Sequence, residues 1–181
     1  GSETGVAEQA EMFGAIAEDF GVEAYQTATK TEDRNALWAM RHKSHYASAS
    51  LGKTGHLMPT DVCVPISKLA EAVVQAQNDA KRLGLTSTIV GHVGDGNFHS
   101  GIALDPTDPE QMKAAEEFTD ALAKTAMRLG GTVSGEHGIG LGKMKYMNAE
   151  HGAGVALMRS IKAALDPKNI LNPGKMLPPA E

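Results

Sequence analysis

The sequence contains one cysteine, few aromatic residues and no long apolar run. Because a lone cysteine cannot form a disulfide within the chain, Cys63 predicts a fold that does not depend on oxidation. No apolar run approaches the roughly 18 residues that a membrane-spanning helix needs, so we predict no such helix. Aromatic residues make up only 4% of the chain, against 20 glycines and 9 methionines. This composition predicts a core of aliphatic and methionine side chains, with glycine concentrated in loops.

The charge balance is mildly acidic, with a formal net charge of -5 at pH 7. This charge argues against a protein that holds nucleic acid through phosphate contacts. Hydrophobic residues make up 41% of the chain and charged residues 22%, which is ordinary for a globular protein and excludes general disorder. The length of 181 residues, without repeats or a linker, predicts a single domain over residues 1–181.

The chain begins with Gly1-Ser2 and enters a helical pattern without a signal or transit peptide. We expect the chain to be a part of a longer protein, and Gly1-Ser2 is also compatible with the remnant of an expression tag. The N-terminus therefore predicts no location.

Segments in which apolar residues recur at helical spacing alternate along the chain with segments in which they recur at strand spacing. Helices are predicted over residues 6–19, 31–50, 67–83, 108–129 and 149–165. Strands are predicted over residues 22–28, 61–65, 86–93, 98–104 and 132–134. Ser67 is expected to cap the third helix, and Asp108 the fourth in a capping box with Gln111. This order predicts an α+β fold, an antiparallel sheet with helices packed on it, nearest to a ferredoxin-like split βαβ core.

Two histidines lie in the hairpin predicted from residues 86–93 and 98–104. Asp95-Gly96 between two β-rich runs indicates a two-residue turn. Such a turn places His92 directly opposite His99 on one face of the sheet, with Cβ atoms roughly 4.5–5.5 Å apart. At that distance two imidazoles can bind one metal ion. The alternative is that both are ordinary polar residues on a solvent-exposed face.

A third ligand can come from Glu136 or His137, which lie in a glycine-flanked loop directly after a predicted strand. Glycine lets the backbone of such a loop approach a ligand closely. Catalytic zinc sites commonly have three protein ligands and one open position. A flexible surface loop is the alternative interpretation of residues 135–142.

Four segments resemble motifs of FAD-linked oxidases related to vanillyl-alcohol oxidase. Residues 91–99 resemble the family's GHxGDGNxH motif, and residues 135–140 resemble its GEHGIG segment. Residues 165–175 resemble its C-terminal LDP and NPGK signature. Residues 61–67 resemble the strand before the cap-domain helix, most closely in cytochrome-linked D-lactate dehydrogenases. The resemblance covers residues 35–177 in the family's order.

The resemblance implies a two-part enzyme, with an N-terminal FAD-binding domain and a C-terminal substrate domain, also called the cap domain. This chain matches the C-terminal domain, and the FAD-binding domain is absent from it. The implied activity is that of an FAD-dependent D-2-hydroxy-acid dehydrogenase, which oxidises D-lactate or a related 2-hydroxy acid to the 2-oxo acid by hydride transfer to flavin N5. The isolated part is expected to be inactive. The alternative is a stand-alone metal- or ligand-binding module without redox activity.

The resemblance also implies roles for residues of the two glycine-rich motifs. His92, His99 and Glu136 match the metal ligands of the family's metal-dependent members. His137 matches the base that takes the hydroxyl proton, a role that imidazole fills most often in enzymes. A divalent cation beside the 2-hydroxyl group lowers the pKa of that group and fixes its orientation.

Three further residues match the family less tightly. Arg41 resembles an arginine that binds the substrate carboxylate, which suits its guanidinium fork, although a solvated helix face is the alternative. Asn97 and Asn172 resemble positions near the cofactor. Asn97 is equally suited to a turn, and Asn172 to satisfying backbone groups in the tail. Lys143 is expected at the surface, and Cys63 is expected to be a small core residue.

The implied cofactors are FAD, bound mainly by the missing domain, and a divalent metal. Zinc or manganese is favoured, although two histidines and one carboxylate also admit iron and cobalt. The implied partners are a small 2-hydroxy-acid substrate and an electron acceptor such as cytochrome c, a quinone or an electron-transfer flavoprotein, but no nucleic acid. A homodimer is an expectation, because a lone cap domain exposes the face meant for its missing partner. The expected locations are the cytoplasm or the periphery of a respiratory membrane, mitochondrial in a eukaryote.

Overall fold

The computed structural model describes residues 1–22 and 26–179. The chain divides into two compact units, Gly1–Ser44 and His45–Glu181. The division falls within a helix, and the single domain over residues 1–181 remains a prediction. Among the described residues, no helix is both long and apolar enough to span a bilayer.

The N-terminal unit contains α1 (Glu3–Asp19) and most of α2 (Thr31–Ala49). Ser2 caps α1 by accepting the backbone N–H of Gly5 at 3.2 Å. Both helices confirm the prediction. The strand predicted over residues 22–28 falls partly on residues 23–25, which lie outside the described residues, and its other residues are not in a strand.

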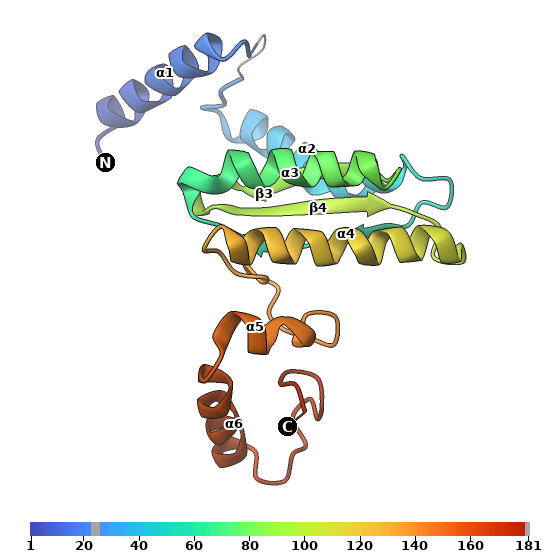
Figure 1. Cartoon of the computed structure of the whole chain (residues 1–181). Coiled ribbons are helices and arrows are strands. Elements are labelled where there is room, and N and C mark those ends of the chain that lie inside the picture. Colours follow the sequence, from blue (N-terminus) through green and yellow to red (C-terminus); the bar gives the residue numbers. More distant parts are fainter. Residues whose placement is uncertain (23–25, 180–181) are drawn as a thin grey trace. The chain divides into compact units, whose positions relative to one another are not determined.

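The second unit is built on an antiparallel sheet with β4 at its centre (Figure 1). Its strands are β1 (Leu57–Pro59), β2 (Val62–Cys63), β3 (Thr86–His92) and β4 (Asn97–Ala103). β3 pairs with one side of β4, and β1 and β2 pair with the other side in a single shared register. Thr132 forms an antiparallel bridge with Cys63 at the outer side of β2. The strand predicted over residues 61–65 is therefore present as the shorter β2, whereas the strand predicted over residues 132–134 is reduced to the single bridge at Thr132.

The order of the elements is that of the predicted ferredoxin-like split βαβ core. β2 leads through α3 (Leu69–Arg82) to β3, and β4 lies between β2 and β3 in the sheet. β4 leads through α4 (Pro109–Arg128) to the bridge at Thr132. Helices α3 and α4 pack against each other and run along β4 (Figure 1). The α+β prediction is confirmed.

The two helices begin in different ways. The Asp108 carboxylate accepts the backbone N–H groups of Glu110 and Gln111, and the Gln111 side chain donates to Asp108 at 2.8 Å. The predicted N-cap at Asp108 is confirmed, but the reciprocal bond of a capping box is not formed, because the backbone N–H of Asp108 donates to the main-chain oxygen of Asp105. The predicted cap at Ser67 is wrong, because that residue lies inside a 3₁₀ turn, Ile66–Lys68, which leads directly into α3.

The hydrophobic core lies between the helices and one face of the sheet. Phe98, Ser100 and Ile102 alternate along β4 and are fully buried on this face. Small alanines at every fourth residue line the buried face of α3: Ala72, Ala76 and Ala80. The residues that alternate with these three on β4, including His99, point to the opposite face. Because the helices cover one face of the sheet, the site lies on the opposite face, which carries His99.

The C-terminal segment consists of α5 (Met147–His151), α6 (Gly154–Leu165) and an irregular tail. The single helix predicted over residues 149–165 is wrong, because Gly152 has a φ of 49° and ends α5. The buried Asp166 accepts the backbone N–H groups of Ile170 and Leu171 and pairs with Lys162. This carboxylate fixes the turn from α6 into the tail.

Candidate metal centre

The hairpin of β3 and β4 brings His92 and His99 to one face of the sheet. The predicted pairing is wrong in its register, since His92 pairs with Asn97 and His99 pairs with Val90. The register differs from the prediction by two residues. A shift of two preserves the face of every side chain, so the histidines become diagonal neighbours instead of direct partners.

The turn of the hairpin explains the difference in register. It consists of a 3₁₀ turn, Val93–Asp95, followed by Gly96 with a φ of 78°. A two-residue turn at Asp95-Gly96 would instead have paired residue 94 with residue 97. A Cβ at Gly96 would lie 1.9 Å from the carbonyl oxygen of Val64, so glycine is required at this position for space as well as for conformation.

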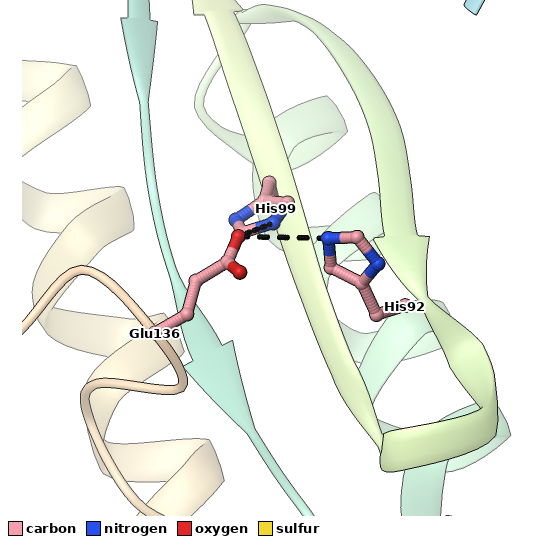
Figure 2. Close-up of side chains that lie close together, drawn as sticks. All are labelled: His92, His99 and Glu136. Carbon is pink, nitrogen blue, oxygen red and sulfur yellow. Dashed lines mark ion pairs between the residues drawn. The ribbon is translucent and has the colours of Figure 1, made fainter. Parts of the chain in front are cut away.

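Glu136 completes a cluster with the two histidines, and its carboxylate faces both of their rings (Figure 2). Its Oε1 atom lies 3.0 Å from His99 Nε2 and 3.6 Å from His92 Nε2. The imidazole rings stand at 89° to each other with centroids 6.0 Å apart. The His99 side chain is 12% exposed, whereas those of His92 and Glu136 are half-exposed. The cluster is therefore anchored on the sheet and open to solvent on one side.

The geometry and chemistry of this cluster fit one divalent cation. One ligand atom from each of the three residues lies within 4.8 Å of the other two. Ligand bonds of about 2.0–2.2 Å at tetrahedral or octahedral angles separate two ligand atoms by about 2.8–3.6 Å. Both distances from Glu136 Oε1 to the histidines agree with that range. Two imidazoles and one carboxylate suit zinc, manganese, iron or cobalt.

The backbone of the neighbouring strand fixes the orientation of the His99 ring. His99 Nδ1 lies 3.1 Å from the carbonyl oxygen of Thr60. Because a carbonyl oxygen only accepts hydrogen bonds, Nδ1 must be the donor. In the neutral ring, Nε2 then has a free lone pair and faces Glu136, which is the tautomer that a metal ligand requires.

His137 lies directly beside the three candidate ligands. Its ring stacks on that of His99, with centroids 5.1 Å apart and planes at 12°. Its Nε2 atom is 3.7 Å from Glu136 Oε1, and its side chain is half-exposed. The structure thus brings together the four residues of the two glycine-rich motifs that the sequence singled out, and it leaves His137 accessible to a small molecule.

Asp61 is a residue of this site that the sequence analysis missed. Its side chain is 1% exposed, and its Oδ2 atom accepts the backbone N–H of His137 at 2.9 Å. Burial alone would raise the pKa of this carboxyl group. The hydrogen bonds from the backbone of His137, the Asn97 amide and the backbone of Glu136, with the charge of Lys143, outweigh burial and hold the pKa well below its usual range. The sequence offers one sign of this role: Asp61 is an acidic residue at the start of a predicted strand that is otherwise apolar.

Lys143 is not the solvated surface residue that was predicted. Its side chain is only 20% exposed. The Nζ atom donates to the main-chain oxygen of Asp61 at 2.6 Å and lies 3.3 Å from Asp61 Oδ2. Lys143 therefore balances the charge of the buried Asp61 carboxylate. A buried carboxylate without such a partner is strongly disfavoured.

The other predicted site residues occupy different environments. Arg41 lies on the N-terminal unit, is exposed, and donates to Ser44 Oγ at 3.2 Å. Asn97 is buried at the start of β4, where its amide nitrogen donates to Asp61 Oδ1 at 2.7 Å. Asn172 is exposed in the tail with a φ of 47°. Cys63 is half-buried, and its thiol lies 3.3 Å from the carbonyl oxygen of Asp95.

Comparison with known proteins finds a family and several relatives that match nearly the whole chain. Residues 1–176 match the family described as FAD linked oxidases, C-terminal domain. The chain is 42% identical to a Danio rerio protein named "Probable D-lactate dehydrogenase, mitochondrial", over 98% of the chain and 36% of the relative. It is 37% identical to "D-lactate dehydrogenase [cytochrome], mitochondrial" of Arabidopsis thaliana, over 99% of the chain and 32% of the relative.

A relative from Saccharomyces cerevisiae named "D-lactate dehydrogenase [cytochrome] 1, mitochondrial" is 36% identical, over 90% of the chain and 28% of the relative. The chain thus spans about a third of the length of these curated relatives. The family match covers both compact units and both glycine-rich motifs. The chain belongs to the family of FAD-linked oxidase C-terminal domains.

Proposed function

We propose that this chain forms the substrate side of an FAD-dependent D-2-hydroxy-acid dehydrogenase, with D-lactate as the favoured substrate. The observation that carries the proposal is the convergence of His92, His99 and Glu136 with His137 stacked beside them. Family membership supports FAD as the cofactor. The names of the relatives support D-lactate.

In this proposal His92, His99 and Glu136 hold a divalent cation. The charge of a bound cation favours the deprotonated form of a hydroxyl group next to it. Two of the ligands come from a rigid hairpin and the third from a loop tied to the sheet through Asp61. The substrate hydroxyl group can approach from the side on which His92 and Glu136 are half-exposed.

His137 takes the hydroxyl proton in the same reaction. Its Nε2 is 3.7 Å from Glu136 Oε1, but among the described residues only His92, His99 and Glu136 have ligand atoms that all lie within 4.8 Å of one another. FAD, when bound, supplies the acceptor for the hydride that leaves C2. Loss of the O–H proton to His137 and of the C2 hydride converts the 2-hydroxy acid to the 2-oxo acid, so that atoms and electrons balance.

The remaining roles also rest on the family. Arg41 binds the substrate carboxylate, and Asn97 and Asn172 act near the cofactor. The Asn97 amide nitrogen is already bonded to Asp61 and to the main-chain oxygen of Val62. The names of the relatives favour a cytochrome as electron acceptor and a mitochondrial location. A homodimer remains part of the proposal.

Metal binding of the chain tests the candidate centre. We expect one zinc or manganese ion per chain in a calorimetric titration, and a loss of affinity of at least about 100-fold in the His92→Ala, His99→Ala double variant. His151→Ala is the matched control, because His151 also faces a single carboxylate, with Nε2 3.6 Å from Glu150 Oε1, outside the cluster. Equal affinity in the double variant and the control would remove the centre from the proposal.

Activity of the isolated chain tests the need for the other part of the enzyme. We expect no reduction of an artificial dye when the chain is mixed with D-lactate, FAD and zinc or manganese. The physical reason is that FAD must be held next to C2 for hydride transfer. Sustained turnover by the chain alone would show that it binds FAD itself, and the fragment interpretation would be wrong.

A further inference from the structure

Asp61 lies at the centre of the contacts that support the candidate metal centre. β1 and β2 share one register on β4, which places Asp61 opposite His99 on the same face of the sheet. Asp61 Oδ1 is 3.7 Å from His99 Nδ1. The carboxylate therefore lies behind the His99 ring, on the side away from Glu136.

The carboxylate of Asp61 orients the loop that carries Glu136 and His137. Its Oδ2 atom accepts the backbone N–H of Glu136 at 3.1 Å and that of His137 at 2.9 Å. Two consecutive N–H groups on one oxygen fix the direction of the peptide units and thus the points from which both side chains leave the backbone. Ser134 Oγ, 3.3 Å from the same oxygen, supports the start of the loop.

The loop can come this close because residue 135 is glycine. A Cβ at Gly135 would lie 1.9 Å from Asn97 Nδ2 and 2.9 Å from Asp61 Oδ1. The backbone of the loop is therefore pressed against the buried polar groups of β4 and its neighbouring strand.

Asp61 is itself not available as a metal ligand. Its Oδ1 accepts from Asn97 Nδ2 at 2.7 Å, and its Oδ2 faces two backbone N–H groups and Lys143. These donors account for the acceptor positions of a carboxylate. The residue acts on the site through the residues that it holds.

We propose that Asp61 is the positioning residue of this centre, which sets Glu136 and His137 against His92 and His99 by binding the backbone of the loop. The inference rests on the proposed function for the identity of the bound cation, but the contacts of Asp61 with the loop are independent of it. Partners that orient metal ligands from behind change metal affinity by about 10–100-fold when they are removed.

The test compares Asp61→Asn with a matched control, Asp166→Asn. An asparagine has the same shape but replaces one acceptor oxygen by an NH₂ donor. It therefore cannot accept both from Asn97, which donates to Oδ1, and from the loop and Lys143, which donate to Oδ2. Asp166 is also buried, also accepts two consecutive backbone N–H groups and also pairs with a lysine, in the turn after α6. The Asp61→Asn, Lys143→Met double variant avoids an unpaired lysine charge. It replaces the single variant in both measurements if the single variant does not fold.

Two measurements decide the outcome. Cobalt titration, followed by visible absorption, is expected to show affinity about 10–100-fold lower in Asp61→Asn and unchanged in Asp166→Asn. Amide hydrogen exchange by NMR is expected to be at least about tenfold faster at Glu136 and His137 in Asp61→Asn, and at Ile170 and Leu171 in Asp166→Asn.

A folded Asp61 variant with unchanged amide exchange at Glu136 and His137 would overturn the inference. Equal loss of cobalt affinity in Asp166→Asn would also overturn it, because the effect would then be general destabilisation. If the unaltered chain binds no cobalt, the metal centre of the proposed function fails. The amide exchange at Glu136 and His137 then decides alone whether Asp61 positions the loop.

Discussion

The ring of His137 lies nearly parallel to the ring of His99, with a centroid separation of 5.1 Å and an angle of 12° between the planes. One of these residues is a candidate metal ligand, and the other is the candidate base. Their contact is a stacking of two rings and leaves both Nε2 atoms near Glu136 Oε1, at 3.0 Å for His99 and 3.7 Å for His137. Whether His137 acts as the base or as a further ligand is therefore a question for experiment, because its Nε2 is about as far from Glu136 Oε1 as that of His92, at 3.6 Å.

His137→Gln tests which of these two roles His137 has. If His137 is a base beside the metal, the variant should bind zinc or manganese within about threefold of the unaltered chain, whereas His99→Ala should lose at least about 100-fold. In an enzyme that carries this chain together with its FAD-binding part, loss of a general base should lower kcat by about 10²–10⁴-fold. A loss of metal affinity in His137→Gln as large as that in His99→Ala would identify His137 as a ligand instead.

Gly135→Ala tests how tightly the loop is packed on the buried polar groups. The added Cβ would lie 1.9 Å from Asn97 Nδ2, so we expect the free energy of unfolding to fall by about 1–3 kcal/mol. Gly140→Ala is the control, because a Cβ there meets nothing within 4 Å, and it should change the free energy of unfolding by less than about 0.5 kcal/mol. Urea denaturation followed by far-UV circular dichroism measures both. Equal stability of the two variants would contradict the close approach of the loop.

Much of the fold could be predicted because local patterns determine it. The helix predicted from the apolar spacing of α1 and the N-cap at Asp108 involve residues close in sequence, and both are confirmed. The sheet face of His92 and His99 was also predictable despite the wrong register, since a shift of two residues preserves the face. The turn itself was not, because Asp95-Gly96 fits the two-residue turn locally, whereas the longer turn packs Gly96 closely against Val64, a residue distant in the sequence.

The support of the site depends on contacts between residues distant in sequence. Asp61 meets the loop of Glu136 and His137 and the amine of Lys143 only in the folded chain. No spacing in the sequence encodes these contacts, so the sequence predicts Asp61 only as the first residue of a strand and Lys143 as a surface residue. The break between α5 and α6 was missed because a glycine is tolerated within many helices, and here Gly152 adopts a φ of 49°.

Gly96→Ala tests whether the hairpin turn controls the distance between the two histidines. A Cβ at Gly96 would lie 1.9 Å from the Val64 carbonyl oxygen, and its φ of 78° is unfavourable for alanine. We expect a loss of about 1–3 kcal/mol in the free energy of unfolding and weaker zinc binding. Gly94→Ala, in the same turn, should leave both unchanged, because a Cβ at Gly94 has no neighbour within 4 Å. Unchanged zinc affinity in a destabilised Gly96→Ala would show that the turn does not set the geometry of the centre.

The turn after α6 should depend on pH in the acid range. The hydrogen bond from Lys162 and the N–H groups of Ile170 and Leu171 outweigh burial and lower the pKa of Asp166 from 3.8 to about 2. Because the pKa is lower in the folded than in the unfolded chain, the stabilisation by Asp166 is fully present above the unfolded pKa. It is lost as the pH falls below that value and through about 2.

NMR spectra recorded from about pH 5 to about pH 2 measure this dependence, because a backbone N–H that donates to a carboxylate shifts when the carboxylate is protonated. The amide protons of Ile170 and Leu171 should titrate together with a midpoint of about 2. Asp166→Asn removes the titrating group and should abolish the shift at both residues. A midpoint near 3.8 in the unaltered chain would show that Asp166 is not held by Lys162 and the tail, and that the turn is fixed by other contacts.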